Sequence, residues 1–233
     1  MKNWMTSSEP LDINLQGGGD AAALFFTRRT AMNTENITDI TMNFNNPNWI
    51  LDHITIALQR TSDECIVKRP CDLDGIEQYL ILRGEQDGAH YSVKVVPVLL
   101  SNAGIEENHA WDRALENLSA DTQITSLGKV LSDLMDAPYD SSMDADVKFH
   151  VITNTQKFKG AAAIMNRKAP KTFTQKYRTN MLFVLPSSIH EMMIAPYDSS
   201  LNLDELSAMV KEINETQVAP EERLTDRAYI ITL

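Results

Sequence analysis

The stretch that decides the fold is MLFVLPSSIHEMMI, residues 181–194, in which two short apolar runs flank a Pro-Ser-Ser segment. Short runs rich in branched and aromatic apolar residues are typical of strands, and proline followed by serines favours a turn. The stretch therefore predicts a β-hairpin, with strands over 181–185 and 189–194. Because a hairpin joins antiparallel strands, this part of the chain belongs to an antiparallel or mixed sheet.

The sequence beyond this hairpin predicts a capped helix and a closing strand. Asn202, followed three residues later by Glu205, is a variant of the capping box that begins many helices. Apolar residues then recur at helical spacing, and a short strand-like run follows at 229–232. The predicted buried stripe of the helix consists of Leu203, Leu206, Val210 and Ile213.

The first two thirds of the chain show the same mixture of hairpins and helices. A turn-rich segment at 84–88 separates two strand-like runs, which predicts a second hairpin. Because hairpins outnumber β-α-β units, the sequence indicates an α+β fold, with an antiparallel or mixed sheet and helices packed mainly on one face. The remaining predicted elements are helices over 48–59, 105–118, 124–135 and 170–177, and strands over 78–82, 90–100, 147–153 and 160–165.

The composition fits one large folded core. The chain has 233 residues, of which 43% are hydrophobic and 23% are charged, as is ordinary for a globular protein. We expect a single α+β core over residues 46–233. Residues 1–45 contain a glycine triplet and a run rich in Asn and Thr, and we interpret them as an N-terminal extension or irregular segment.

The cysteines and the N-terminus indicate a cytoplasmic protein that holds no metal or cofactor. Cys65 and Cys71 are too few for a disulfide framework, and their spacing is wider than that of a zinc knuckle. The N-terminus lacks the apolar region of a secretory signal. The most apolar run, 93–100, is too short to cross a bilayer.

Charge is distributed unevenly along the chain. Residues 147–190 hold eight Lys or Arg and no Asp or Glu, whereas the other residues carry 13 basic and 32 acidic side chains. The net charge of −11 opposes binding to naked nucleic acid and to anionic membranes. The basic stretch (residues 148–178) therefore indicates an acidic protein partner, contact with phosphates, or internal pairing with the acidic segments 106–144 and 191–222. The candidate partner-binding residues are Lys157, Lys159, Arg167, Lys168, Lys171, Lys176 and Arg178.

One cluster combines the residue types of a hydrolase, namely Ser187, Ser188, His190 and Glu191. A catalytic triad needs a serine hydroxyl within hydrogen-bond reach of a histidine that an acid orients. On a strand, Ser188 and His190 would share a face with their Cα atoms about 6–7 Å apart, but Glu191 would point the other way. No Gly-x-Ser-x-Gly elbow surrounds either serine. Turn chemistry at a hairpin is the simpler interpretation.

Two strings near the C-terminus carry a family resemblance, LPSSIHE at 185–191 and NETQVAPEE at 214–222. With weaker echoes upstream, at 151–154 and 160–162, they resemble a bacterial family of Gram-positive gut anaerobes whose function is not established, over residues 76–232. The resemblance implies a bacterial cytoplasm and a neighbourhood of mobile DNA, where accessory and anti-defence proteins are frequent. It supplies no activity, cofactor or catalytic residue.

Three hypotheses about function follow from these patterns. The first is a non-enzymatic interaction or accessory protein, with an anti-defence or regulatory role, that binds a protein or a protein–nucleic acid complex. The second is a small serine hydrolase that uses Ser187 or Ser188 with His190. The third is a regulator that binds nucleic acid directly through the basic stretch.

Overall fold

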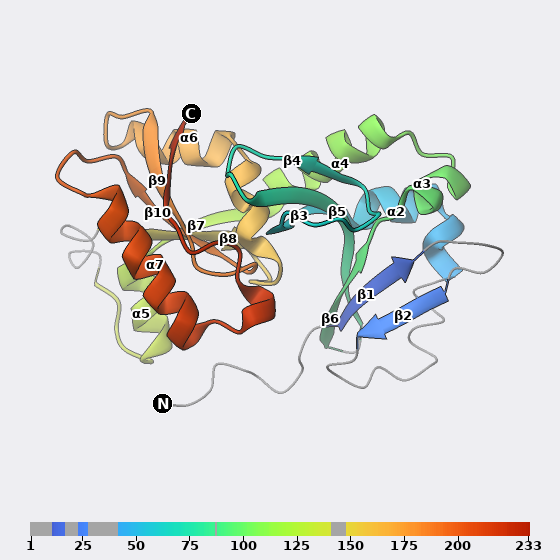
Figure 1. Ribbon diagram of the computed structural model, residues 1–233, viewed down its shortest axis with the longest axis horizontal. Helices are drawn as coiled ribbons and strands as arrows, with labels where there is room; N and C mark the ends of the chain where they lie inside the picture. Colours follow the sequence, from blue (N-terminus) through green and yellow to red (C-terminus); the bar gives the residue numbers. More distant parts are fainter. Residues whose placement is uncertain (1–10, 17–22, 28–41, 87, 141–147) are drawn as a thin grey trace. The chain divides into compact units, whose positions relative to one another are not determined.

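The computed structural model describes residues 11–16, 23–27, 42–86, 88–140 and 148–233 (Figure 1). They form an α+β fold with two separate sheets, which confirms the predicted fold class. By its internal contacts the chain divides into two units. The first is drawn from residues 1–56, 63–69 and 79–117, and the second from 57–62, 70–78 and 118–233. A single core over 46–233 stays a prediction.

The first sheet has the strand order β2-β1-β6-β5-β3, with β4 beside β5. The predicted hairpin around 84–88 is confirmed, because β5 and β6 pair antiparallel with Leu82 opposite Val93. The strand predicted over 90–100 ends at Lys94, because Pro97 begins a helix. No element was predicted within residues 1–45, but β1 and β2 pair there with each other, and β1 runs parallel to β6. The strands are β1 Leu11–Gln16, β2 Ala23–Thr27, β3 Ile54–Arg60, β4 Lys68–Pro70, β5 Ile76–Gln86 and β6 Ala89–Lys94.

The helix predicted over 48–59 ends earlier than expected. Helix α2, Pro47–His53, begins at a cap in which the Asn46 side chain accepts hydrogen bonds from two backbone N–H groups. The chain then becomes strand β3, whose first five residues are all buried. Continuous burial of β-branched residues favours a strand, whereas the helical spacing of the apolar residues had suggested one long helix. The other helices of this part are α3 Pro97–Asn102 and α4 Glu107–Asp121.

The second sheet is antiparallel throughout its described pairings, with the order β11-β9-β10-β8-β7. The hairpin of residues 181–194 is confirmed as β9 and β10, with Pro186 opposite Met192. Its second strand begins at Met192 rather than Ile189, because residues 187–191 form the loop. The strands are β7 Thr122–Ser126, β8 His150–Asn154, β9 Met181–Pro186, β10 Met192–Pro196 and β11 Tyr229–Thr232.

Helix α7, Leu203–Gln217, covers strand β9 and closes one hydrophobic core (Figure 1). The predicted cap is present, since the Asn202 side chain accepts a hydrogen bond from the backbone N–H of Asp204. Leu206 and Val210 are each 4% exposed and pack against the sheet. The core cluster comprises Phe183, Leu185, Ala195, Leu206, Val210 and Ala228.

One predicted element of the second unit is wrong, and another is shorter than predicted. Residues 160–165 form a 3₁₀ helix, η3 Gly160–Met165, rather than a strand, because small residues let this segment pass close to its neighbours. The helix predicted over 124–135 is strand β7 followed by helix α5, Leu127–Leu134. The Ser126 side chain caps α5 by accepting from the Lys129 N–H, which separates the two elements. Helix α6, Lys168–Gln175, confirms the predicted helix in that region.

Candidate anion-binding groove

A groove of about 730 Å³ lies in the second unit, bordered by β7, the first turn of α5 and helix α6. Strand β7 pairs with β8 so that Ser126 is opposite His150, and both residues line the groove. Hydroxyl-bearing and amide side chains form much of the wall. These polar lining residues are Ser119, Thr122, Thr125, Ser126, Asn166 and Thr172.

The charge of the groove is opposite to that of the whole chain. Three lysines, Lys129, Lys168 and Lys176, line it together with His150, and no Asp or Glu occurs among its described lining residues. The chain as a whole carries 32 acidic side chains and a net charge of −11. Positive groups gathered in a concave site concentrate the field there, so the groove attracts anions.

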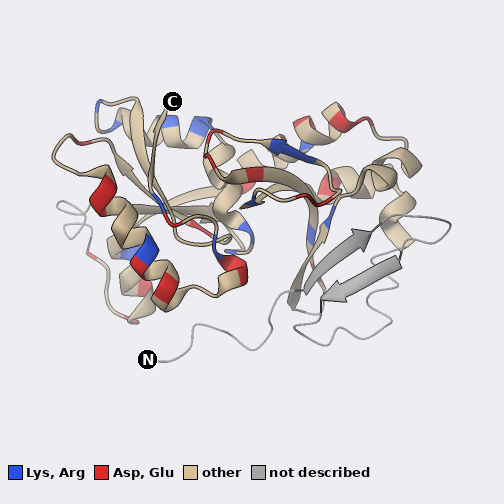
Figure 2. Ribbon diagram, viewed as in Figure 1, with Lys and Arg blue, Asp and Glu red and all other residues tan. Residues whose placement is uncertain are grey.

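Two of the lysines come from one face of helix α6. Lys168, Thr172 and Lys176 follow one another at intervals of four residues, and all three line the groove. The start of the helix is fixed by Asn166, whose side-chain oxygen accepts from the backbone N–H groups of Lys168 and Ala169. Lys168 and Lys176 are exposed, and neither forms an ion pair with any residue in the described part of the chain. Figure 2 shows Lys and Arg residues in blue along α6.

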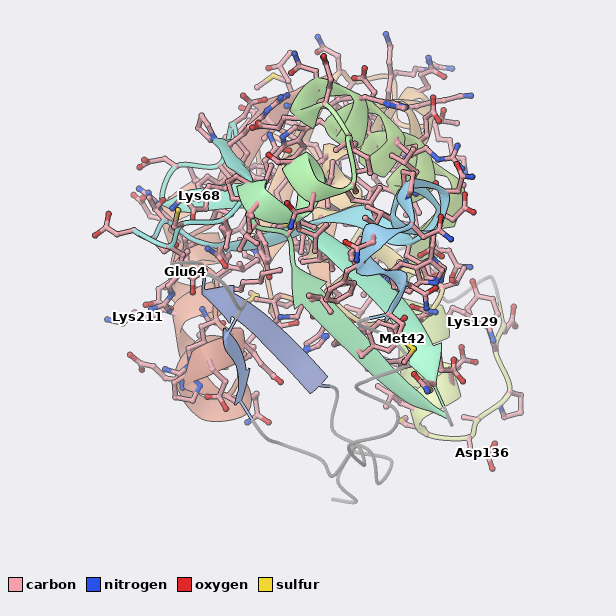
Figure 3. All side chains as sticks on the ribbon, turned by 90° about the vertical axis from the view of Figure 1, so that its right-hand side faces the viewer. Met42, Glu64, Lys68, Lys129, Asp136 and Lys211 are labelled. Carbon is pink, nitrogen blue, oxygen red and sulfur yellow. The ribbon has the colours of Figure 1, made fainter. Side chains whose placement is uncertain are left out.

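The third lysine, Lys129, is held in the first turn of α5 (Figure 3). Its ammonium group lies 2.5 Å from a carboxylate oxygen of Asp133 and 5.5 Å from the centre of the Tyr139 ring. The Tyr139 hydroxyl is in turn 3.3 Å from the Ser126 hydroxyl. The side chain of Lys129 is still 42% exposed, so it remains accessible to a ligand in the groove.

Aromatic side chains form another part of the wall. The ring centroids of His150 and Phe173 are 4.6 Å apart, and those of Phe173 and Tyr177 are 5.2 Å apart. Phe173 is 5% exposed and anchors the cluster, whereas Tyr177 is 41% exposed. The aromatic wall (His150, Phe173 and Tyr177) therefore offers apolar ring surface beside the lysines.

The other predicted partner-binding residues lie outside the groove's lining. Arg167 forms an ion pair with Asp72, and Lys159 is only 6% exposed. Lys148, at the start of the basic stretch, pairs with Asp198, so part of the stretch is neutralised inside the second unit. The residues Lys157, Lys171 and Arg178 are exposed.

The groove also contains residues that the sequence did not single out, Lys129 and Tyr139. They come from a segment predicted as helix and from the turn after it. Only the pairing of β7 with β8 brings them beside the basic stretch. The sequence held one signal for the start of α5. Ser126 precedes the apolar run at 127–134, and serine is a preferred N-cap residue.

The serine–histidine cluster closes the loop between β9 and β10. The Ser187 hydroxyl donates to the carbonyl of Glu191 at 2.9 Å, and the Ser188 hydroxyl accepts from the backbone N–H of His190 at 3.0 Å. The Nδ1 atom of His190 accepts from the backbone N–H of Lys159 at 3.2 Å. Its Nε2 atom therefore carries the proton and lies 3.5 Å from a carboxylate oxygen of Glu222.

The cluster lacks the serine–histidine contact of a catalytic triad. Within the described part of the chain, no hydrogen bond joins either serine hydroxyl to the ring of His190. Burial raises the pKa of the Glu191 carboxyl, and the nearby Lys157 and His190 offset part of that rise. The assignment of the cluster to loop structure stays a prediction that a chemical probe can test.

Neither metal-binding nor membrane-spanning features emerge from the described ranges. They contain no group of three or more His, Cys, Asp or Glu that could hold a metal ion. No helix within them has the length and apolar character needed to cross a bilayer. Cys65 and Cys71 are free thiols, and burial raises the pKa of the Cys71 thiol, which disfavours its reactive thiolate form.

Neither the curated proteins nor the solved structures include a match to this chain. One family model does match, over residues 68–231, which include the groove, both strings and all of the second sheet except Thr232. The chain therefore belongs to a family of unknown function, DUF5688.

Proposed function

We propose that the chain is a non-enzymatic binding protein that captures an acidic segment of a partner protein in its groove. The observation that carries this proposal is the set of three lysines and no carboxylate lining a groove in a strongly acidic chain. Lys168 and Lys176 are exposed and form no ion pair within the described part of the chain, so their ammonium groups are available to the carboxylates of a ligand.

The charge of the whole chain favours a short acidic segment over a long nucleic acid. A nucleic acid carries one charge per nucleotide along its length, so it meets the field of the entire chain as well as the groove. A short segment of protein meets mainly the local field of Lys168 and Lys176, because Lys129 is already paired with Asp133. Salt screens interactions beyond about 8 Å at physiological ionic strength, so the lysines nearest to the bound segment dominate the field that it meets.

A second candidate function is direct binding of single-stranded nucleic acid through the basic stretch. The aromatic wall supports it, because rings beside basic side chains are typical of single-strand binding sites. The serine hydrolase has less support, since the hydroxyls of Ser187 and Ser188 are engaged in loop closure.

The biological setting is part of the same proposal. The family resemblance suggests an accessory protein of a mobile element, with an anti-defence or regulatory role, whose partner is a protein or a protein–nucleic acid complex. Free thiols at Cys65 and Cys71 fit a reducing cytoplasm.

The test is fluorescence anisotropy with a labelled acidic peptide and two double variants of equal net charge. Lys168→Glu/Lys176→Glu changes the groove, and Lys171→Glu/Lys211→Glu changes exposed lysines outside its lining. Exposed ion pairs contribute up to about 1 kcal/mol each, so the groove variant should lose roughly tenfold in affinity. Equal losses in the two variants would mean that only net charge matters, and the groove would not be the site.

A further inference from the structure

We infer that the acidic segment bound by the groove carries an aromatic side chain, which packs on the aromatic wall while neighbouring carboxylates contact the lysines. This inference rests on the proposed function and specifies the chemistry of its ligand. It assigns a specificity role to Tyr177 and positioning roles to His150 and Phe173.

The size of the groove is the first reason. Its volume of about 730 Å³ lies within the range of about 300–1,000 Å³ that is typical of sites enclosing a substantial ligand. Carboxylates alone need no such space, because a flat surface with lysines can pair with them. The groove therefore fits a bulky group together with its charged neighbours.

The exposure of Tyr177 is the second reason. It is 41% exposed although its ring lies 5.2 Å from the nearly buried ring of Phe173 and 6.4 Å from that of His150. The interplanar angles of these two pairs are 54° and 76°, so neither ring covers the other face to face. A ring from a ligand can then make the offset or edge-to-face contacts that aromatic pairs prefer.

The composition around the wall is the third reason. Ile124 from β7 and Ala169 from α6 add apolar lining beside the rings, and Lys168 and Lys176 flank that part of the helix. Binding energy in protein interfaces usually concentrates in an aromatic anchor within a pocket, with charges around it. The groove has both parts of such a site.

A nucleotide base would also stack on these rings, but the observations favour the peptide. Three lysines line the groove, and one of them, Lys129, is already paired with Asp133. That leaves little positive charge to offset the repulsion between a polyanion and a chain of net charge −11. Nucleic acid is therefore an outcome that the experiment must distinguish.

The experiment uses the full chain and three acidic peptides that differ only at a central residue, which is Trp, Leu or Ala. A neutral Trp peptide and a single-stranded oligonucleotide complete the set. The Trp peptide should bind about three- to tenfold more tightly than the Ala peptide, with the Leu peptide between them, because aromatic contacts add to the buried area. The neutral Trp peptide should bind weakly.

Two tyrosine variants locate the effect. Tyr177→Leu should remove the advantage of the Trp peptide and leave the affinity for the Ala peptide unchanged, and Tyr177→Phe should retain the advantage. Tyr197→Leu is the matched control, because Tyr197 is also exposed and stacked on a ring, that of Phe183, outside the groove. Circular dichroism confirms that each variant is folded.

Each failure has its own meaning. Equal affinities for the Trp and Ala peptides, with dependence on Lys168 and Lys176 intact, would overturn this inference and leave the proposed function standing. Absence of binding by every acidic peptide would overturn both. Tighter, Tyr177-dependent binding of the oligonucleotide would also overturn both and make single-stranded nucleic acid the ligand.

Discussion

Gly160 offers a sharp test of how the loop between β9 and β10 is supported. It begins the 3₁₀ helix η3 and passes between the end of β8 and that loop. A Cβ atom at this position would clash with the hydroxyl oxygen of Thr153, and it would lie 2.7 Å from the carbonyl oxygen of His190 and 2.8 Å from the backbone nitrogen of Asn154. Two of these three atoms belong to the backbone, so rotation of a side chain cannot relieve the clash.

Two effects of Gly160→Ala oppose each other. Alanine restricts the unfolded chain, which alone would stabilise the protein by about 0.4–1 kcal/mol. Overpacking of a tight site typically costs about 1–3 kcal/mol. Since the contacts fall well below 3 Å, we expect the steric cost to win by about 1–2 kcal/mol, which corresponds to a fall in Tm of roughly 2–8 °C.

Thermal and urea unfolding of the wild type, Gly160→Ala, Thr153→Ala and the double variant measure this effect. The double-mutant cycle separates the clash with the Thr153 hydroxyl from the clashes with the backbone. We expect the double variant to recover only part of the loss. A Gly160→Ala protein as stable as the wild type would refute the reasoning, because the segment would then have room to move.

Three further predictions concern the core, the loop and its carboxylate. Leu206→Ala removes a side chain that is 4% exposed and should lower the unfolding free energy by about 2–5 kcal/mol. Lys211→Ala should change the unfolding free energy by less than about 0.5 kcal/mol. Equal melting temperatures of the two variants would contradict the packing of α7. A serine-directed phosphonate should leave Ser187 and Ser188 unmodified by mass spectrometry, and labelling of either would restore the hydrolase hypothesis. Because the pKa of Glu191 is raised above 4.5 in the folded protein, the folded state binds the proton more tightly, so stability should fall as pH rises through the interval above 4.5. Glu191→Gln should remove that part of the pH dependence, and an unchanged profile would show that burial does not govern this carboxyl.

The sequence predicted those elements that depend on residues close together in the chain. The cap at Asn202, the Pro-Ser-Ser turn and the closing strand at 229–232 were all predicted and are present. Strand β3, residues 54–60, was not predicted, because the spacing of its apolar residues fits a helix. Only the burial of every position at the start of β3 reveals the strand. Helical spacing cannot distinguish these cases without the neighbouring strands.

Some lysines of the groove could be predicted from the sequence, and one could not. Lys168 and Lys176 could be selected from the sequence, because they belong to a stretch without acidic residues. Lys129 could not, because its place depends on β7 pairing with β8, and β7 had the pattern of a helix. In α5 the buried residues are Gly128 and Ser132, whereas Leu131 and Leu134 are exposed.

The most direct test of the groove is zero-length cross-linking of an N-acetylated acidic peptide to the full chain with a carbodiimide. The reagent joins a carboxylate to an amine only where the two are in contact, and mass spectrometry then identifies the modified lysines. The account predicts peptide adducts on Lys168 and Lys176 that disappear at high salt. Adducts on Lys157 and Lys211, with Lys168 and Lys176 unmodified, would contradict it.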